Sequence, residues 1–391
     1  MAASDNGKVH SSDQMTSRER LLGAYRREPL DRLPYWAKVT NDTWRSSQPE
    51  HVRRWSDREL LDYIRADGIF GIGRCVRTAS PRIRVEDRLR DNVRTRVTHT
   101  PDGELAEQWT MDPCTRSWHP TVFPVKTRDD LERCRWLYCE RRITVNAEAL
   151  DAAASRAEQI GQRGITKVGW GTSPLMDLIQ HVIGPAGTVY FLADCPSQME
   201  ELMALMHEAN LALVACLAER TPADLVVSVE NTSTTLLSPR LFQTYCYRHL
   251  CEYGRLIERA GKIHELHMCG TLLDLLEEID GIPAAAIEAF SAPPLGNTRL
   301  ADGKALAASK TLVGGTCVNV WWRSTPAQIE RFILDELAAC ADDLGIVLTT
   351  AGVAPPACTV ETFRAVGQWI ASVPFRPGAG QQRAAAGADR A

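Results

Sequence analysis

Apolar and polar positions along the chain follow an order that predicts a helix before each strand from residue 147 onward. Helical periodicity over residues 147–162 precedes a short apolar run at 165–170, and this order recurs five more times. The later pairs are helices 195–219, 239–260, 271–279, 300–309 and 325–343 with strands 225–230, 262–269, 284–290, 311–316 and 346–350. Apolar runs near residues 34 and 68 bring the predicted strands to eight. Alternating helices and strands in this number are typical of an α/β fold, the parallel (β/α)8 TIM barrel.

Residues 82–125 have a different pattern, in which polar and apolar positions alternate with the period of two that is typical of exposed strands. The turn sequence Pro101-Asp102-Gly103 divides this segment and favours a hairpin. We therefore expect a small β insertion near residues 82–125. The two ends, 1–15 and 377–391, are polar or rich in Gly and Ala and are expected to be disordered tails. Residues 16–376 then form a single barrel domain.

The composition is ordinary for a soluble globular protein. Of 391 residues 44% are hydrophobic and 24% are charged, and the net charge of −4 offers no broad basic surface for nucleic acid or an anionic membrane. The sequence has no run of 18 apolar residues, and Met1 is followed by a polar segment rather than a signal peptide. We expect a cytoplasmic protein whose twelve cysteines are reduced thiols.

The run His267-Met268-Cys269-Gly270 is the strongest candidate for chemistry. In an extended strand, residues two apart point to the same face, so His267 and Cys269 would lie side by side at the end of a strand. An imidazole and a thiol supply half of a zinc site, which usually needs three protein ligands and an open position. The alternative is that both residues are buried core side chains, which is common for an isolated pair of this kind.

Other polar side chains are expected at the carboxyl ends of the predicted strands, where the chemistry of such barrels takes place. Glu230 and Glu288 are candidates for acid–base catalysis together with His267. Asn231 and Asn319 are candidates for hydrogen bonding to a substrate, and Trp170 for an apolar rim. Each asparagine could equally cap a strand end.

Several short motifs occur in one order along nearly the whole chain. They are Thr16-Ser17-Arg18-Glu19-Arg20-Leu21-Leu22, Asp31-Arg32-Leu33-Pro34, Thr100-Pro101-Asp102-Gly103-Glu104-Leu105, Ser238-Pro239-Arg240-Leu241-Phe242, His267-Met268-Cys269-Gly270, Pro294-Leu295-Gly296, Gly314-Gly315 and Thr325-Pro326. In this order and spacing the chain, from about residue 16 to 373, resembles the uroporphyrinogen decarboxylase-like superfamily.

The resemblance implies one of two branches. Porphyrin decarboxylases hold substrate carboxylates with an R-Q-A-G-R segment after the first strand, but here that place has Lys38-Val39-Thr40-Asn41-Asp42-Thr43-Trp44. A tetrapyrrole would lack its arginine clamp, so we reject that activity. The closer branch comprises the zinc-dependent, cobalamin- or folate-linked methyltransferases, such as the methylcobamide:coenzyme M methyltransferases.

In that branch an H-x-C-G motif and a later cysteine bind zinc. His267 and Cys269 match the first two ligands, whereas the family's P-G-C-like turn is replaced by Thr350-Ala351-Gly352. Cys358 is the candidate for the third metal ligand, with Cys317 and Glu230 as alternatives. A metal-bound thiol is deprotonated at neutral pH and can attack an electrophilic methyl group.

The resemblance therefore implies a methyltransferase that moves a methyl group between a corrinoid, a folate or a methylated small molecule and a zinc-activated thiol or another nucleophile. Its expected cofactors are Zn²⁺ and a corrinoid or tetrahydrofolate methyl carrier. Its expected partners are a small-molecule substrate, a corrinoid protein and a second copy of the chain in a homodimer. Two alternatives stay open: a metal-free decarboxylase or other lyase acting on a small carboxylic acid, and a non-catalytic barrel that binds a corrinoid protein.

Overall fold

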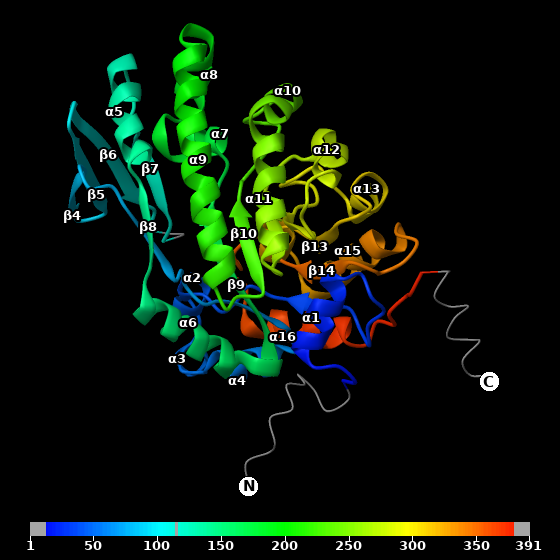
Figure 1. Ribbon diagram of the computed structural model, residues 1–391. Coiled ribbons are helices and arrows are strands. Elements are labelled where there is room, and N and C mark those ends of the chain that lie inside the picture. The colour runs from blue at the N-terminus through cyan, green and yellow to red at the C-terminus, as the bar shows by residue number, and fades with distance from the viewer. Residues whose placement is uncertain (1–12, 114–115, 379–391) are drawn as a thin grey trace.

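The fold is built around eight parallel strands. The computed structural model describes residues 13–113 and 116–378. In the sheet the strands lie in the order β1-β14-β13-β12-β11-β10-β9-β2, so the chain winds nearly once around a barrel (Figure 1). Their bounds are β1 Tyr35–Trp36, β2 Gly68–Gly71, β9 Gly164–Gly171, β10 Leu225–Val229, β11 Ile263–His267, β12 Ala286–Phe290, β13 Thr311–Gly314 and β14 Ile346–Thr349. All eight coincide with strands predicted from the sequence, and the predicted TIM barrel is confirmed.

Alternation along each strand divides the core into two parts. Side chains such as Trp36, Ile165 and Val227 fill the inside of the barrel in one apolar cluster. Their neighbours Tyr35 and Val226 belong to a second, larger cluster between the barrel wall and the helices. This alternation decides which strand residues face the cavity described below and which face the helices.

Helices cover the outside of the barrel. Before the insertion these are α1 Ser17–Tyr25, α2 Asp42–Ser46, α3 Glu50–Arg53 and α4 Asp57–Ile64. After it come α5 Arg128–Cys139, α6 Ala147–Ile160, the 3₁₀ turn η1 Gly161–Arg163, α7 Pro174–Asp177, the π-helical turn η2 Leu178–Val182, α8 Pro185–Asp194 and α9 Pro196–Arg220. The second half has α10 Pro239–Phe242, the π-helical turn η3 Gln243–Tyr247, α11 Arg248–Arg259, the 3₁₀ turn η4 Leu273–Leu275, α12 Leu276–Asp280, α13 Leu300–Leu306, α14 Val318–Arg323, α15 Pro326–Ala338 and α16 Val360–Ile370.

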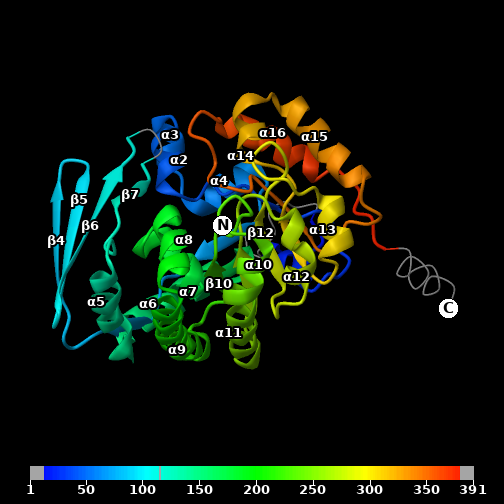
Figure 2. The ribbon, with the colours of Figure 1, turned by 90° about the horizontal axis from the view of Figure 1, so that it is seen from above.

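The predicted β insertion is a four-stranded antiparallel sheet that stands beside the barrel (Figure 2). Its strands are β4 Arg84–Arg90, β5 Val93–Thr100, β6 Gly103–Met111 and β7 Trp118–Val122. The predicted turn closes the β5–β6 hairpin, where Thr100 pairs with Gly103. A second small sheet, β3 Val76–Ala79 with β8 Arg142–Val145, was not expected, because its two short strands lie 66 residues apart in the chain and carry no clear alternation.

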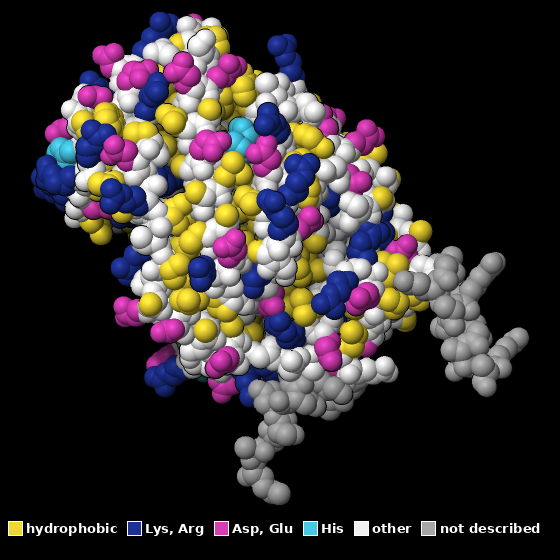
Figure 3. All heavy atoms as spheres, viewed as in Figure 1, with side chains coloured by type: hydrophobic (Ala, Val, Ile, Leu, Met, Phe, Trp, Pro, Cys, Tyr) yellow, Lys and Arg dark blue, Asp and Glu magenta, His cyan; other side chains and the backbone are white. Residues whose placement is uncertain are grey.

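Arginines of the insertion are paired with carboxylates. Arg94 and Arg96 both contact Asp87, and Arg84 contacts Glu86. Over the visible face of the molecule Lys and Arg side chains are interspersed with Asp and Glu (Figure 3). These arginines of the insertion are therefore paired with acidic side chains and do not form a continuous basic patch.

The chain ends differ from the predicted tails where they can be followed. Residues 13–15 were assigned to the N-terminal tail, yet Asp13 is buried against Arg20 and Arg32. Of the predicted tails 1–15 and 377–391, residues 1–12 and 379–391 lie outside the described residues.

Within residues 13–113 and 116–378, one helix, α9, is long and apolar enough to cross a membrane by length and composition alone. Half of its apolar window is buried inside the protein, as in a core helix. Figure 1 shows it packed along the barrel wall next to α11, which accounts for its apolar residues without a membrane.

Candidate active site

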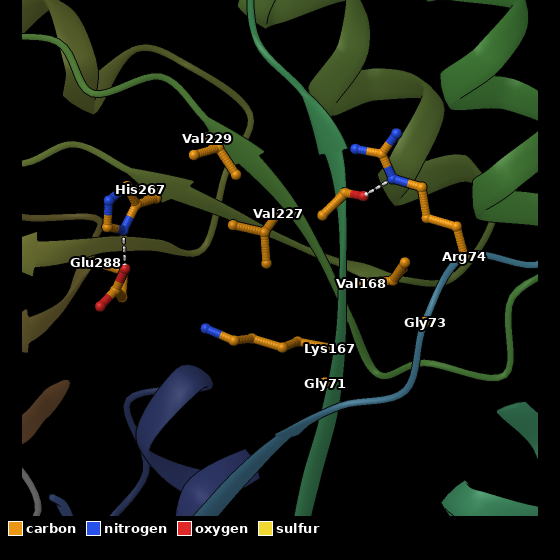
Figure 4. A pocket seen from close by; sticks show the side chains of 10 residues that line it. Gly71, Gly73, Arg74, Lys167, Val168, Val227, Val229, His267 and Glu288 are labelled. Carbon is orange, nitrogen blue, oxygen red and sulfur yellow. Dashed lines mark hydrogen bonds and ion pairs between the residues drawn. The ribbon is translucent and has the colours of Figure 1, made fainter. Parts of the chain in front are cut away.

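A cavity of about 450 Å³ opens at the carboxyl ends of the barrel strands. Its wall is formed by β2, β9, β10, β11 and β12, and its polar lining residues are Arg74, Lys167, His267 and Glu288. Figure 4 shows the Lys167 side chain extending toward the His267–Glu288 pair, with Arg74 on the far side. Because β11 and β12 are aligned with His267 opposite Glu288, the strand register itself brings these two side chains together.

Glu288 lies between two positive groups. It contacts Nδ1 of His267 and the ammonium of Lys38. Burial acts to raise the pKa of Glu288, but the charges of Lys38 and His267 outweigh it and hold that pKa well below its usual range. Burial likewise acts to lower the pKa of His267, but Glu288 and a hydrogen bond with Cys269 raise it to about 9. At neutral pH His267 is therefore a cation and Glu288 an anion.

Two lysines enter the barrel just below this pair. Nζ of Lys38 lies 4.8 Å and Nζ of Lys167 lies 4.4 Å from the centre of the Trp36 ring. Two residues before His267 on the same face, Glu265 is hydrogen-bonded to the hydroxyl of Tyr25. Burial raises the pKa of Glu265, although the charge of Lys167 opposes that shift. With Arg74, the basic side chains around the cavity outnumber the acidic side chains of Glu288 and Glu265.

Cys269 joins the same group of side chains. Its thiol is hydrogen-bonded to Oδ1 of Asn231 at 3.2 Å, and it also shares a hydrogen bond with the His267 imidazole. Asn231 has a left-handed backbone conformation with φ 49° and donates from Nδ2 to Gln180 at 2.6 Å. Four of the candidates predicted from the sequence, His267, Cys269, Glu288 and Asn231, thus gather at this mouth.

Glu230 does not join the group of side chains around His267. Alternation along β10 turns Val227 and Val229 toward the cavity, so Glu230 points to the helix layer. There its fully buried carboxylate accepts hydrogen bonds from Ser173 N at 2.6 Å, Ser173 Oγ at 2.7 Å and Thr172 Oγ1 at 3.1 Å. Burial raises its pKa to about 7. Glu230 holds the start of α7 and is not brought to His267.

Cys358 is also remote from the pair. It belongs to the apolar cluster outside the barrel wall together with Tyr35 and Trp44. Its carbonyl accepts a hydrogen bond from Trp44 Nε1 at 2.8 Å, and its thiol is hydrogen-bonded to Thr362. Since Tyr35 faces outward on β1 and Trp36 inward, Cys358 lies on the other side of the wall from His267.

The remaining alternative, Cys317, precedes α14, where its thiol lies 3.8 Å from the carbonyl of Pro293. Across residues 13–113 and 116–378, no group of three or more His, Cys, Asp and Glu side chains is arranged to hold a metal ion. His267 has one feature of a zinc ligand, since its Nδ1 is held by a carboxylate and leaves Nε2 for another partner. Among the described residues, His267 and Cys269 are therefore suited to be two of the protein ligands of a zinc ion, but no third His, Cys, Asp or Glu is arranged with them to complete a three-ligand centre.

The two other predicted substrate-binding residues have separate places. Trp170 is buried, and its Nε1 donates to Ser228 Oγ at 2.8 Å. Its ring lies edge-on to Tyr253. Trp170 also lines a second cavity of about 410 Å³ beside the first. Asn319 lies in the first turn of α14 and lines neither of these two cavities.

Sequence reasoning missed Lys38, Lys167 and Arg74 as site residues. A usable signal existed for Lys167, because it occupies an inward position of β9 between Ile165 and Gly169, where an unpaired charge is unusual. Lys38 has a left-handed conformation with φ 53° after a strand of only two residues, and no sequence pattern predicts its direction.

Comparison with known proteins gives a family and a fold. The model of the family described as uroporphyrinogen decarboxylase (URO-D) matches residues 119–367. No curated protein matches the chain. Among solved structures, a methyltransferase from Methanosarcina mazei is similar, with a TM-score of 0.59 and 14% sequence identity over 91% of this chain and 98% of that chain. At this identity the likeness concerns the fold alone.

Proposed function

The chain belongs to the uroporphyrinogen decarboxylase family, and from this premise we propose that it is a methyltransferase whose reacting centre is the cluster His267, Cys269 and Glu288. The observation that carries the proposal is an imidazole, held by the buried carboxylate of Glu288 and two residues before a thiol, at the mouth of a ligand-sized cavity. The similar fold of a solved methyltransferase is in keeping with it.

The chemistry proposed for this centre is attack of a thiolate on a methyl group. A positively charged imidazole stabilises a thiolate beside it, and His267 is positive at neutral pH. The acceptor thiol loses its proton to solvent. Its sulfur forms a bond to the methyl carbon while the bond from that carbon to the donor breaks. The electron pair stays on the donor, and a folate donor takes up a proton at the nitrogen that the methyl group leaves. Glu288 and Lys38 keep the imidazole in its orientation and charge state.

The methyl donor of the proposal is a methylcorrinoid, carried by a partner protein, or methyl-tetrahydrofolate. Asn231 holds Cys269 and its own amide is held by Gln180, so Asn231 is a positioning residue. Trp170 contributes the wall of the adjoining cavity. None of these steps needs a metal ion.

The test is a methyl-transfer assay with methylcobalamin or 5-methyl-tetrahydrofolate as donor and 2-mercaptoethanesulfonate as a small anionic thiol. We expect donor consumption by the wild type and a loss of about 100-fold or more in kcat/KM for His267→Ala. His51→Ala, which removes an exposed imidazole on α3, should leave the rate unchanged. Consumption of neither donor would reject the proposed activity.

Zinc is a separate proposal that rests on the family resemblance. If His267 and Cys269 bind it, metal analysis of the purified protein will give about one zinc per chain, and His267→Ala or Cys269→Ala will abolish it. Cys358→Ala should leave the zinc content unchanged, because Cys358 lies outside the barrel wall. A wild type without zinc would remove the metal from the proposal, and loss of zinc in Cys358→Ala would place that residue in the site.

The charge of the cavity favours one second candidate, a metal-free decarboxylase of a small acid. Lys167 and Arg74 would bind the carboxylate, and protonated His267 would donate a proton to the carbon that loses CO₂. Release of CO₂ from an acid without any methyl donor would favour this activity over methyl transfer.

A further inference from the structure

Three cavities lie next to one another on the face that carries the active site. The inner cavity, of about 450 Å³, holds His267 and Glu288. A middle cavity, of about 410 Å³, is bounded by Trp170 and Asn231. An outer cavity, of about 610 Å³, lies between the β insertion and the barrel, with Leu105 of β6 among its lining residues.

Side chains shared between neighbouring cavities connect them. Arg74 and Val229 line both the inner and the middle cavity. Thr78, Arg141 and Asp177 line both the middle and the outer cavity, as does His181. Arg74, Thr78, Val229 and His181 are exposed, and Arg141 and Asp177 are partly exposed. Both junctions are thus lined by side chains that solvent reaches at least in part.

We propose that the three cavities form one channel that binds an elongated substrate with an oxyanion at its inner end. The oxyanion lies between Arg74 and Lys167, next to the reacting centre, and the body of the molecule extends beneath the β insertion. The proposal rests on the proposed function only in taking the inner cavity as the active site.

The inner end of the channel is suited to an anion because the basic side chains of Arg74 and Lys167 both line the inner cavity. Nε of Arg74 donates to the carbonyl of Gly169 at 2.6 Å (Figure 4), which fixes the guanidinium at the wall of the inner cavity. Because the Arg74 side chain is exposed, an anion can reach its guanidinium from the cavity. A carboxylate or a phosphate matches the planar donor pair of an arginine.

The outer end is suited to an apolar body. Ile83, Val85, Leu105 and Val182 line it, and the ring of Trp109 is stacked on His181 with centroids 6.0 Å apart. A small substrate needs only one cavity of this size. Three cavities in a row fit a longer amphipathic molecule, because charged side chains line one end and apolar side chains line the other.

A hydrogen-bonded group separates the middle and outer cavities. Asp177 ends α7 and accepts from Nδ1 of His181 at 2.9 Å and from the hydroxyl of Tyr138 at 3.3 Å. His181 is part of the π-helical turn η2, a conformation that is frequent at functional sites. These polar groups provide hydrogen-bonding partners partway along the bound molecule.

The test is calorimetric titration with benzoate, 4-phenylbutanoate and 8-phenyloctanoate, and with the corresponding neutral amides. We expect affinity for the wild type to rise with length by about tenfold or more over the series, and the amides to bind at least about tenfold more weakly than the acids. Arg74→Gln should weaken all three acids. The control Arg82→Gln, which removes an exposed arginine of the insertion, should weaken none.

Blocking variants locate the molecule along the channel. Thr78→Trp obstructs the junction of the middle and outer cavities, so it should remove the gain from length but preserve benzoate binding. Ala79→Trp, which alters the outer cavity alone, should weaken only 8-phenyloctanoate. Thr144→Trp, on the exposed face of the partner strand β8, is the matched control, and thermal unfolding establishes that each variant is folded.

Two results would overturn the channel proposal. One is equal affinity for all three acids, and the other is an equal loss of affinity for benzoate and 8-phenyloctanoate in Thr78→Trp. Amides that bind as tightly as the acids would overturn the oxyanion site. Phenyl phosphate titrated beside benzoate distinguishes the two oxyanions, and failure of both to bind would overturn the oxyanion site. These titrations need no methyl donor. Binding of the acids can therefore be observed even if the methyl-transfer assay fails, and methyl transfer can be observed even if the acids do not bind.

Discussion

At the scale of single residues, the active-site proposal depends most on Glu288. This carboxylate is almost fully buried and stays ionised because it contacts both Lys38 and His267. Isolated buried charges are costly, and removing one partner of such a group leaves the others uncompensated. The charge of the imidazole and the position of Lys38 therefore both depend on Glu288.

Replacement of this residue by its neutral isostere tests that dependence. In Glu288→Gln the pKa of His267 should fall from about 9 toward its ordinary value, because the largest influence raising it is gone. NMR titration of the His267 ring would measure the shift, and kcat/KM should decrease by about 100-fold. Glu277→Gln, an exposed carboxylate on α12, should change neither quantity, and an unshifted His267 in Glu288→Gln would contradict the coupling.

Sequence pattern was sufficient for part of this site. His267 and Cys269 could be placed together by the two-residue period of a strand, and Glu288 by its position near the end of the next strand. Cys358 could not be placed, because a cysteine in an irregular segment after β14 has no periodicity to tell which side of the wall it faces. Glu230 was placed at the correct strand end but on the wrong face, since a shift of one residue reverses the direction of a side chain.

At the scale of elements, the turn after β11 is the one that orients the His267–Cys269 pair. Gly270 has φ 130°, and a Cβ there would lie 2.7 Å from Ser233 Oγ. That hydroxyl accepts from the amide of Thr271 at 3.2 Å. The glycine thus lets the chain leave the strand and pack against the loop that follows β10.

Gly270→Ala should destabilise the protein by about 1–3 kcal/mol, through backbone strain and contact with Ser233. It should also lower methyl transfer by displacing Cys269. The matched control is Gly261→Ala, where φ is 72° but no atom would lie within 4 Å of the new Cβ, so only the smaller conformational cost applies. Urea unfolding of the two variants measures the difference, and equal losses would show that Ser233 tolerates the added methyl group.

Regular elements were easier to predict than irregular ones. The six barrel strands from β9 onward and the long helices have strong periodicity, whereas β1 and β2 are short. At the start of α1, Thr16 is the N-cap and forms a capping box with Glu19. The segment from α7 to α8 was not predicted, because it is broken by two proline-initiated helices and a π-helical turn that follow no single period. This segment also carries Asp177 and His181, so the least predictable element contributes to the proposed channel.

At the scale of the molecule, a buried ion cluster attaches the N-terminal segment to the barrel. Asp67, which precedes β2, contacts Arg20 at 2.7 Å and Arg32 at 3.0 Å, and Arg20 also contacts Asp31 at 2.7 Å. Burial acts to raise the pKa of Asp67, but the charges of Arg32 and Arg20 lower it below its ordinary value of 3.8. The cluster joins parts of the chain that are up to 47 residues apart.

Asp67→Asn should destabilise the protein by about 3–5 kcal/mol at pH 7, because two buried guanidinium groups lose a carboxylate. Since the folded-state pKa of Asp67 is lower than the unfolded one, its contribution is present above about pH 4 and is lost as the pH falls through the folded-state value. Urea unfolding from pH 7 to pH 3 should therefore show a steeper loss of stability in the wild type than in the variant. Asp274→Asn, at an exposed position, serves as the control.

The nearly closed barrel has a further consequence for motion. β1 pairs with β14 and β2 with β9, and the seam between β1 and β2 is bridged by the amide of Asp67, which donates to the carbonyl of Tyr35 at 2.7 Å. Local opening of a protein begins where the backbone has few hydrogen bonds. Amide hydrogen exchange should therefore be faster beside this seam than in β10 or β11, and transient opening there would widen the space between Lys38 and Arg74, which follow β1 and β2.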